Sequence, residues 1–342
     1  MRVIRSLLFV AIAINLVALA PARSQIIPDD QVFGLYRWDA ARGVLFFRKN
    51  FLLRKMNSPL RSYNDDGSQR GADINLFKDF PDIQEATVDD FAAGLAGTTC
   101  IAAELIYGPR TVKNVVLTYD SAGYLRAVVD IAPYSAEAIT ADDQGNVFVL
   151  GERSDEREGD APYPLLIKYD PSGNVVGRAL NSDLFKDGSD GIQYFGRGYE
   201  RVSASLSLQD GNLYVYAPDE NEVLVCAVDG KILRRAKLDD VLLSVARSDK
   251  VHRAAIADVG FTDENHVVLY LTEYVGPEEP NVTDISNMHA AAYVVDLTTR
   301  KFKLILRGEP GLNPAFVGVS GNSLLTLARD KGGFEIQLHD LP

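Results

Sequence analysis

The residue types best suited to ligand binding gather in one short segment, residues 193–201, which reads QYFGRGYER. Aromatic rings and arginine side chains offer large contact areas and planar hydrogen-bonding forks, and both are over-represented at binding hot spots. In a chain with a formal net charge of −12, two nearby arginines also make a local positive spot that suits a small anion such as a carboxylate. We therefore predict a ligand-binding site built from Tyr194, Arg197, Tyr199 and Arg201. Docking of the aromatic rings onto a neighbouring part of the fold is the alternative.

The four histidines of the chain are His252, His266, His289 and His339, and they are the next candidates for acid–base or metal chemistry. None is paired with another at the spacing of a zinc site, so a metal centre would require them to converge from distant parts of the chain. His252 and His289 each precede a predicted strand and could approach a central channel, so we retain both as ligand-binding candidates. We expect His266 and His339 to face solvent.

An acidic segment, DLFKDGSDG, places Asp183, Asp187 and Asp190 close together. Calcium takes several carboxylate oxygens, so such a cluster invites a calcium site. The spacing does not match an EF-hand loop, and no glutamate stands at its twelfth position. The sequence therefore favours a plain acidic turn, with calcium as the alternative.

Catalytic motifs are absent from the sequence: it contains no HExxH, GxSxG, P-loop or CxxC motif. The segment 318–321, GVSG, reads as a hairpin turn rather than the strand-to-helix corner of a nucleophile elbow. The segment 196–198, GRG, lacks the third glycine and the following helix of a dinucleotide-binding loop. The sequence thus predicts no catalytic residue, no metal ligand and no bound cofactor, and it favours a protein that is not an enzyme.

Short strands joined by tight turns must position these residues. Between residues 136 and 180, turn sequences at 142–146 (DDQGN) and 170–173 (DPSG) each separate two runs rich in Val, Ile, Leu, Phe and Tyr. These runs show no 3.6-residue period, so we read them as strands, and the turn residues predict tight hairpins. The predicted unit is four antiparallel strands, a to d, with tight a–b and c–d turns.

This unit recurs along the chain, with c–d glycines at positions 67, 123, 173 and 230. The spacing between these glycines is close to the length of the four-strand repeat that is typical of a β-propeller. We count 23 strands, one fewer than six blades of four require, and residues 26–32 could supply the missing outer strand beside the C-terminal strand. The sequence therefore predicts an all-β fold, a six-bladed β-propeller of four-stranded antiparallel blades, with five or seven blades as alternatives.

Residues 143–149 (DQGNVFV) and 167–173 (IKYDPSG) together resemble an NHL-type repeat of exported six-bladed propellers. The resemblance extends over about four blades and implies a fold rather than a reaction. Propellers of this kind include binding modules, lactonase-like hydrolases and lyases. In the lactonase-like members, carboxylates and asparagines from several blades bind calcium on the axis.

Four connections are longer than the rest, at residues 152–164, 181–201, 239–253 and 275–289. Each is a b–c or a d–a connection, and in a four-strand meander these emerge on one face. Long excursions from a rigid scaffold often carry function, whereas tight turns only connect strands. We therefore expect the binding site on this face.

The first residues have the pattern of a secretory signal, because Arg2 and Arg5 precede an apolar run from Leu7 to Ala20 and small residues follow. That run is shorter than the roughly 20 residues that span a bilayer. We predict a signal peptide at 1–24 and a single propeller domain at 25–342. The protein would be periplasmic or secreted, with no stable membrane anchor after cleavage; a retained anchor is the alternative.

The charge and the cysteines narrow the possible partners and bonds. A net charge of −12 repels phosphate backbones and anionic lipid surfaces, so we expect no nucleic-acid partner. Cys100 and Cys226 fall in the second and fourth predicted blades, too far apart for a disulfide. The sequence as a whole predicts an exported binding or scaffold propeller for a protein or a small ligand. The alternative is a lactonase-like hydrolase or lyase with an axial metal such as calcium.

Overall fold

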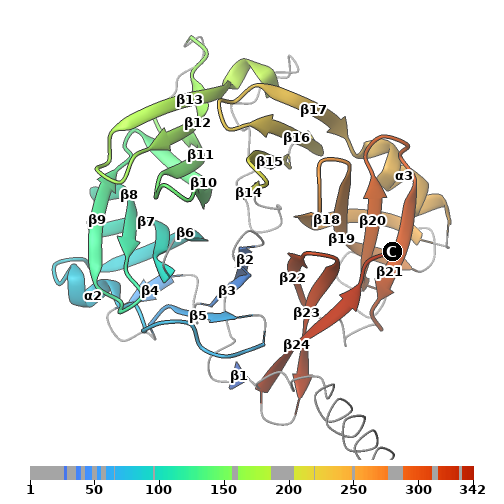
Figure 1. Ribbon diagram of the computed structural model, residues 1–342, viewed down its shortest axis with the longest axis horizontal. Coiled ribbons are helices and arrows are strands. Elements are labelled where there is room, and N and C mark those ends of the chain that lie inside the picture. The colour runs from blue at the N-terminus through green and yellow to red at the C-terminus, as the bar shows by residue number, and fades with distance from the viewer. Residues whose placement is uncertain are drawn as a thin grey trace, which may run out of the picture.

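The computed structural model describes residues 27–28, 36–39, 43–47, 52–54, 59–64, 66–94, 97–155, 161–185, 204–218, 220–248, 251–275, 288–309, 315–330 and 333–342. Within them, six antiparallel sheets stand in a ring around a central axis (Figure 1). Short helices in these residues are α2 (Leu76–Asp79), η3 (Ser182–Phe185) and α3 (Asp239–Ser248). None of the described helices is long and apolar enough to cross a membrane.

Sheets 3 to 5 follow one another along the chain, whereas β4 (Leu52–Arg54) of sheet 2 lies between two strands of sheet 1. Sheet 1 contains β2 (Tyr36–Asp39), β3 (Val44–Phe47) and β5 (Arg61–Asn64). Sheet 2 contains β4 (Leu52–Arg54), β6 (Glu85–Ala93), β7 (Thr99–Gly108), β8 (Thr111–Tyr119) and β9 (Leu125–Asp130). Sheet 3 contains β10 (Tyr134–Ala141), β11 (Val147–Arg153), β12 (Pro164–Tyr169) and β13 (Val175–Asn181).

The second half of the ring has the same order. Sheet 4 contains β14 (Ser205–Gln209), β15 (Asn212–Ala217), β16 (Glu222–Ala227) and β17 (Ile232–Lys237). Sheet 5 contains β18 (Val251–Phe261), β19 (His266–Val275), β20 (Met288–Asp296) and β21 (Phe302–Arg307). Sheet 6 contains β22 (Ala315–Ser320), β23 (Ser323–Asp330), β24 (Gly333–Asp340) and β1 (Ile27–Pro28).

The prediction of an all-β propeller built from four-stranded antiparallel blades is confirmed. Among the described residues, sheets 2 to 6 each have at least four strands and are complete blades, whereas sheet 1 has three strands. Five complete blades match the alternative count rather than the expected six. In sheet 1 we expected two strands over residues 60–77; instead β5 is followed by isolated bridges, Leu60 to Ile74 and Tyr63 to Gln69, and then by helix α2.

The tight turns form because an aspartate at their start satisfies the backbone of the turn. In the c–d turn of sheet 3, Asp170 Oδ1 accepts hydrogen bonds from the amides of Ser172 at 2.9 Å and Asn174 at 2.8 Å. Asp142 accepts from the amides of Gln144 and Asn146 in the same way in the a–b turn. Such local bonds favour turns over continued strand.

The two ends of the described chain meet in sheet 6. Ile27 is paired with Phe334 and Pro28 with Gly333, so β1 adds the fourth strand of that sheet beside β24. The expected closure of the ring by the N-terminal segment is therefore confirmed. This pairing covers the hydrogen-bonding edge of β24 at its first two residues, Gly333 and Phe334.

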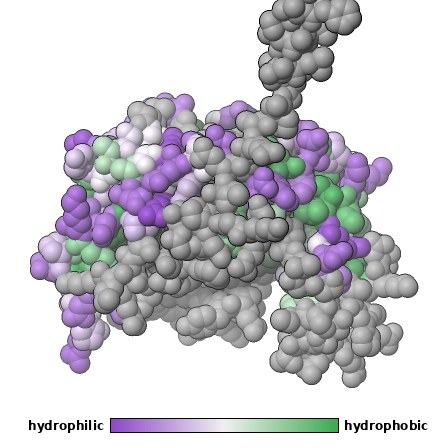
Figure 2. Space-filling model, turned by 90° about the horizontal axis from the view of Figure 1, so that it is seen from below, coloured by the Kyte–Doolittle hydropathy of each residue, from purple (hydrophilic) through white to green (hydrophobic). Residues whose placement is uncertain are grey.

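The hydrophobic core lies between neighbouring sheets. One cluster joins sheets 4 and 5 and includes Val241 and Val245 of helix α3, which are 1% and 0% exposed. Because residues 239–248 are helical, the connection that we expected to be a long loop is in part a packed element. The rim in Figure 2 is largely hydrophilic, with small hydrophobic areas between polar ones. Val176 of β13 and Leu233 of β17, both on outermost strands, are exposed.

Both cysteines are buried and unbonded, as predicted. Cys100 lies in β7 of sheet 2 and Cys226 in β16 of sheet 4, so sheet 3 separates them. Burial raises the pKa of both thiols to about 11. The thiols therefore stay protonated near neutral pH and are poor nucleophiles.

Candidate functional site

The innermost strands of all six sheets meet around a small cavity of about 50 Å³ on the axis. Four of these strands, β6, β10, β18 and β22, contain a β-bulge, which re-aims the side chains of a strand toward one point. The strands approach closely: a Cβ added to Gly260 of β18 would lie 2.5 Å from Cγ2 of Val319 in β22. Most lining residues are small or apolar: Phe91, Ile139, Leu206, Val259, Gly260, Phe261, Phe316, Val317, Gly318 and Val319.

A wider hollow of about 530 Å³ lies at the end of the sheets that carries the a–b turns. It shares Gln209, Phe261 and Val319 with the axial cavity, so the two hollows adjoin, and we refer to them together as the funnel. Its volume falls within the range of about 300–1,000 Å³ typical of small-molecule sites. The wide part is lined by Ala141, Asp142, Asp143, Gln144, Lys168, Leu208, Gln209, Asp210, Gly211, Val228, Phe261, Thr262, Val319 and Gly321.

Lys168 and Asp142 form the main ion pair in the wide part of the funnel. Lys168 Nζ lies 3.0 Å from Asp142 Oδ2 and 4.8 Å from the centre of the Phe148 ring. Burial acts to raise the pKa of Asp142, but hydrogen bonds from Asn146 and Lys168 outweigh it and hold the pKa below its ordinary value. The lysine charge is thus neutralised locally, and the carboxylates of Asp143 and Asp210 leave this surface acidic.

Two aspartates of the innermost strands hold neighbouring sheets together. Asp90 Oδ2 accepts a hydrogen bond of 2.7 Å from the amide of Ile139, which links sheets 2 and 3. Asp39 Oδ2 accepts a bond of 2.7 Å from the amide of Ala93, which links sheets 1 and 2. Both bonds join a carboxylate of one sheet to the backbone of the next, so these residues have a structural role.

Asp258 stands at the junction of sheets 4 and 5. Its Oδ1 accepts from the amide of Val259 at 2.7 Å and lies 3.5 Å from Oγ of Ser205. Like Asp39, it lines the axial cavity. The axis therefore presents two carboxylates in a lining that is otherwise mostly apolar.

Calcium, the metal of lactonase-like propellers, takes six to eight oxygen ligands. The axial cavity offers the carboxylates of Asp39 and Asp258, and each already accepts a backbone hydrogen bond. Within the described residues, no group of three or more His, Cys, Asp and Glu side chains is placed to hold a metal ion. Among the described residues, the cavity therefore offers two carboxylates and the side-chain oxygens of Thr140, Ser205, Ser207 and Gln209. Asp183 is exposed in η3, while Asp187 and Asp190 lie outside the described residues.

The structure does not test the segment that the sequence singled out. Tyr194, Arg197, Tyr199 and Arg201 lie outside the described residues. The sheets do show that the four long connections join b to c or d to a, as expected. They therefore leave the ring at the end opposite to the funnel's wide mouth.

The two histidine candidates lie in different strands. His252 belongs to the innermost strand β18, but its side chain is outside the described part of the chain. His289 lies in β20, the third strand of sheet 5, and its Nδ1 is 3.1 Å from the carbonyl oxygen of Gly308. It does not line the funnel, and the structure does not bring the two histidines' positions to one site. His339 is half-buried against Oγ1 of Thr326 rather than facing solvent, and burial lowers its pKa.

Sequence reasoning missed the funnel residues Gln209, Phe261 and Val319. A signal was present, because each stands at or next to the start of a predicted a–b turn. In a propeller that position returns to the axis once in every repeat. The prediction placed the binding site on the opposite face because the longest connections lie there.

Comparison of the sequence with known protein families gives no match, and comparison with curated proteins gives none either. Among solved structures, the chain is similar to a periplasmic gluconolactonase from Pseudomonas aeruginosa, with 12% identity, a TM-score of 0.40 and coverage of 94% of this chain and 88% of the other. A gluconolactonase from Xanthomonas campestris is 14% identical over 92% of this chain and 88% of its own, with a TM-score of 0.42.

A third similar structure is a GH74 xyloglucanase from Xanthomonas campestris, 13% identical with a TM-score of 0.47. The match covers 92% of this chain and 45% of the xyloglucanase. The chain thus spans less than half the length of that enzyme.

Proposed function

We propose that this protein is a binding propeller that takes a small polar ligand into the axial funnel from the a–b turn face. The observation that carries the proposal is that the 530 Å³ hollow adjoins the axial cavity at Gln209, Phe261 and Val319. A concave site that combines apolar side chains with a few polar groups is the usual form of a small-molecule site.

The polar groups of the mouth indicate the chemistry of the ligand. Gln144 and Asp210 are exposed there, and the one lysine of the lining is paired with Asp142. Amide and carboxylate oxygens at the mouth accept hydrogen bonds from hydroxyl and ammonium groups. The ligand is therefore a neutral polyhydroxyl compound or a small cation rather than an anion.

A thermal-shift screen with monosaccharides, polyols, choline and spermidine tests this proposal, followed by calorimetry of any compound that stabilises the protein. Gln144→Trp should fill the mouth and weaken binding at least about 10-fold, a loss of roughly 1.4 kcal/mol. Ser172→Trp, in the exposed c–d turn of the same sheet, is the matched control. Equal weakening by both variants, or no stabilisation by any compound, contradicts a ligand site in the funnel.

A hydrolase or lyase with an axial metal is the second candidate, since Asp39 and Asp258 line the cavity. The structural bonds of both carboxylates favour binding over catalysis. Metal analysis of the purified protein separates the two, because stoichiometric calcium that survives dialysis would favour the enzyme.

The same proposal includes features that rest on sequence patterns. The protein acts in the periplasm or outside the cell, after removal of residues 1–24. Residues 193–201 form a second contact surface, for a protein or an anionic ligand, on the long-connection face. Sheet 1 serves as the sixth blade of an NHL-type ring, supported by contacts of β2 with both β6 and β22.

A further inference from the structure

A second pocket, of about 360 Å³, lies between sheets 5 and 6 on the outer part of the a–b turn face. We call it the rim pocket. It shares only Thr262 with the funnel. Its wall on the side of sheet 6 is fixed, because Asn322 accepts from the amide of Leu341 at 2.9 Å and donates to the Leu341 carbonyl at 3.1 Å. The lining consists of Thr262, Asp263, His266, Val294, Asp296, Lys301, Phe302, Lys303, Asn322, Leu341 and Pro342.

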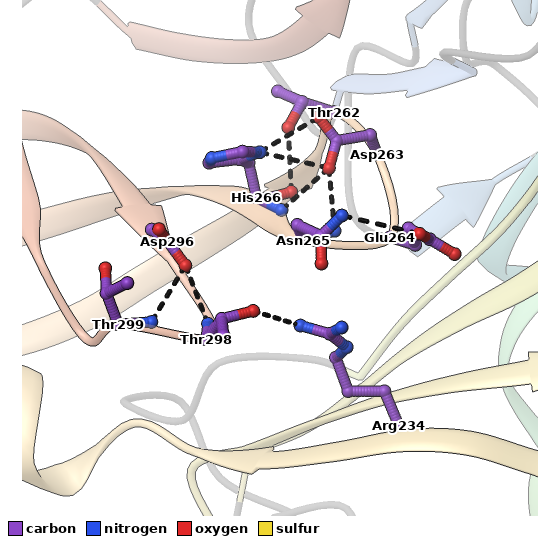
Figure 3. Close-up of polar contacts among 9 residues, drawn as sticks. All are labelled: Arg234, Thr262, Asp263, Glu264, Asn265, His266, Asp296, Thr298 and Thr299. Atoms are coloured by element: carbon purple, nitrogen blue, oxygen red, sulfur yellow. Dashed lines mark hydrogen bonds and ion pairs between the residues drawn. The ribbon is translucent and has the colours of Figure 1, made fainter.

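His266 is held in one orientation at this pocket. Its Nδ1 lies 3.1 Å and 3.0 Å from the two carboxylate oxygens of Asp263. An ionised carboxylate only accepts hydrogen bonds, so Nδ1 carries the hydrogen and donates it. Figure 3 shows that the other ring nitrogen, Nε2, points away from Asp263 and from the turn. Nε2 is thus available for a further polar contact.

Both carboxylates of the rim pocket are engaged in their own turns. Asp263 Oδ1 accepts from the amide of Asn265 at 2.6 Å, and Asp296 Oδ1 accepts from the amides of Thr298 at 2.7 Å and Thr299 at 2.9 Å (Figure 3). The bond from Thr299 is the main reason why the pKa of Asp296 is below its ordinary value. These charges are already balanced by backbone donors, which reduces their repulsion of an anion.

The lysines of the rim pocket are in the opposite situation. Lys301 and Lys303 are exposed, and neither forms an ion pair with a carboxylate of the described residues. They belong to a run, Arg300 to Lys303, that stands out in a chain of net charge −12. Two unpaired ammonium groups beside a concave surface attract anionic oxygens.

We propose that the rim pocket binds a small molecule through an anionic group, a carboxylate or a phosphate. Lys301 and Lys303 supply the charge, and Nε2 of His266, the acceptor nitrogen of the neutral ring, accepts one hydrogen bond from a hydroxyl group of the molecule. The side chains of Val294, Phe302 and Leu341 provide the apolar surface against which the rest of the molecule packs. This site is separate from the funnel. The proposed ligand of the funnel is neutral or positively charged, whereas the rim pocket takes a negatively charged group.

Calorimetry of the full chain with inorganic phosphate and with succinate tests the proposal. We expect binding that weakens as salt is raised, and at least about 10-fold weaker binding by the double variant Lys301→Gln/Lys303→Gln, since contacts to charged groups are the stronger hydrogen bonds. His266→Gln should weaken the binding of phosphate, whose hydroxyl group donates to Nε2, by a smaller factor of about threefold, and should leave the binding of succinate unchanged. The anion that binds more tightly identifies the headgroup as phosphate or carboxylate.

Lys231→Gln is the matched control. Its carbonyl oxygen accepts from the amide of Ala227 at 2.9 Å and closes the c–d turn of sheet 4, as that of Lys301 accepts from Asp296 at 2.9 Å in sheet 5. Lys231 does not line the rim pocket, so its variant should bind as the unaltered protein does. No binding of either anion, or equal weakening by Lys231→Gln, overturns the proposal. Circular dichroism checks that every variant is folded.

Discussion

Sheets 4 and 5 each bury one glutamate beside an arginine of their outermost strand, yet the two glutamates have different surroundings. Glu273 of β19 is 0% exposed, and Arg307 Nε donates to its Oε2 at 2.8 Å. The hydroxyl of Tyr293 donates to the other oxygen, Oε1. Glu222 of β16 is 2% exposed, and its Oε1 accepts from Arg235 Nε at 2.7 Å. The second oxygen of Glu222 is buried without a hydrogen-bond partner.

The difference shows that burial alone does not make a carboxylate part of a stabilising network. Burial raises the pKa of Tyr293, and the hydrogen bond to Glu273 raises it further. Arg307 Nη2 also donates to the Tyr293 hydroxyl at 2.8 Å, so the three side chains form a closed set. When every polar atom of a buried set has a partner, the hydrogen bonds offset the free energy of desolvation. When one carboxylate oxygen has no hydrogen-bond partner, they offset it only in part.

The largest effect is expected from Glu273→Gln. The change leaves Arg307 beside a neutral partner and breaks a buried pair, which costs about 3–5 kcal/mol of unfolding free energy. Urea unfolding of the variant measures the loss. A loss below about 1 kcal/mol would show that the set around Glu273 is no tighter than a surface ion pair.

A smaller effect is expected from Glu222→Gln, the matched change in sheet 4. Arg235 is 41% exposed, so water solvates its charge when the carboxylate is removed. Oε2 of Glu222 accepts no hydrogen bond, so its replacement removes none. We expect a loss of about 1 kcal/mol in the same urea experiment. If the two variants lost equal stability, the contrast between the two sheets would be contradicted.

The smallest effect is expected at low pH, where Asp296 in the c–d turn of sheet 5 becomes protonated. The hydrogen bonds from Thr299 and Thr298 lower the pKa of Asp296. A carboxyl whose pKa is lower in the folded state contributes stability above its unfolded value, about 3.9, and that contribution is lost as the pH falls through the lower folded value. NMR titration should therefore find Asp296 ionised below pH 3.9, and Asp296→Asn should remove that titration while the fold remains. A pKa at or above 3.9 would contradict the role of these bonds.

The parts of the fold that local chemistry controls were predictable. Asp142 and Asp170 predict their turns from the sequence alone. Each accepts hydrogen bonds from two backbone amides that lie within five residues, so the interaction is local. Helix α3 was also readable, since Asp239 and Asp240 stand in its first turn and Val241 and Val245 lie one turn apart. We took the segment for a loop because its flanking strands dominated the pattern.

The funnel was not predictable in the same way. Gln209, Phe261 and Val319 belong to three different sheets and come together only when the ring closes. Which of their faces turns toward the axis depends on β-bulges, such as those in β18 and β22, that no local turn signal specifies. Site geometry here is a property of the ring, whereas the turns are a property of single hairpins.

The pairing of β1 with β24 has a consequence for the order in which the protein can mature. Ile27 can pair only after Phe334 has been synthesised, about three hundred residues later in the chain. Sheets 3 to 5 each consist of four consecutive strands and can form as they are made, because they need only local contacts. The last sheet can close only when translation is almost finished. Completion of the ring is therefore a late event, and a chain truncated before residue 333 would carry a first strand with nothing to pair with.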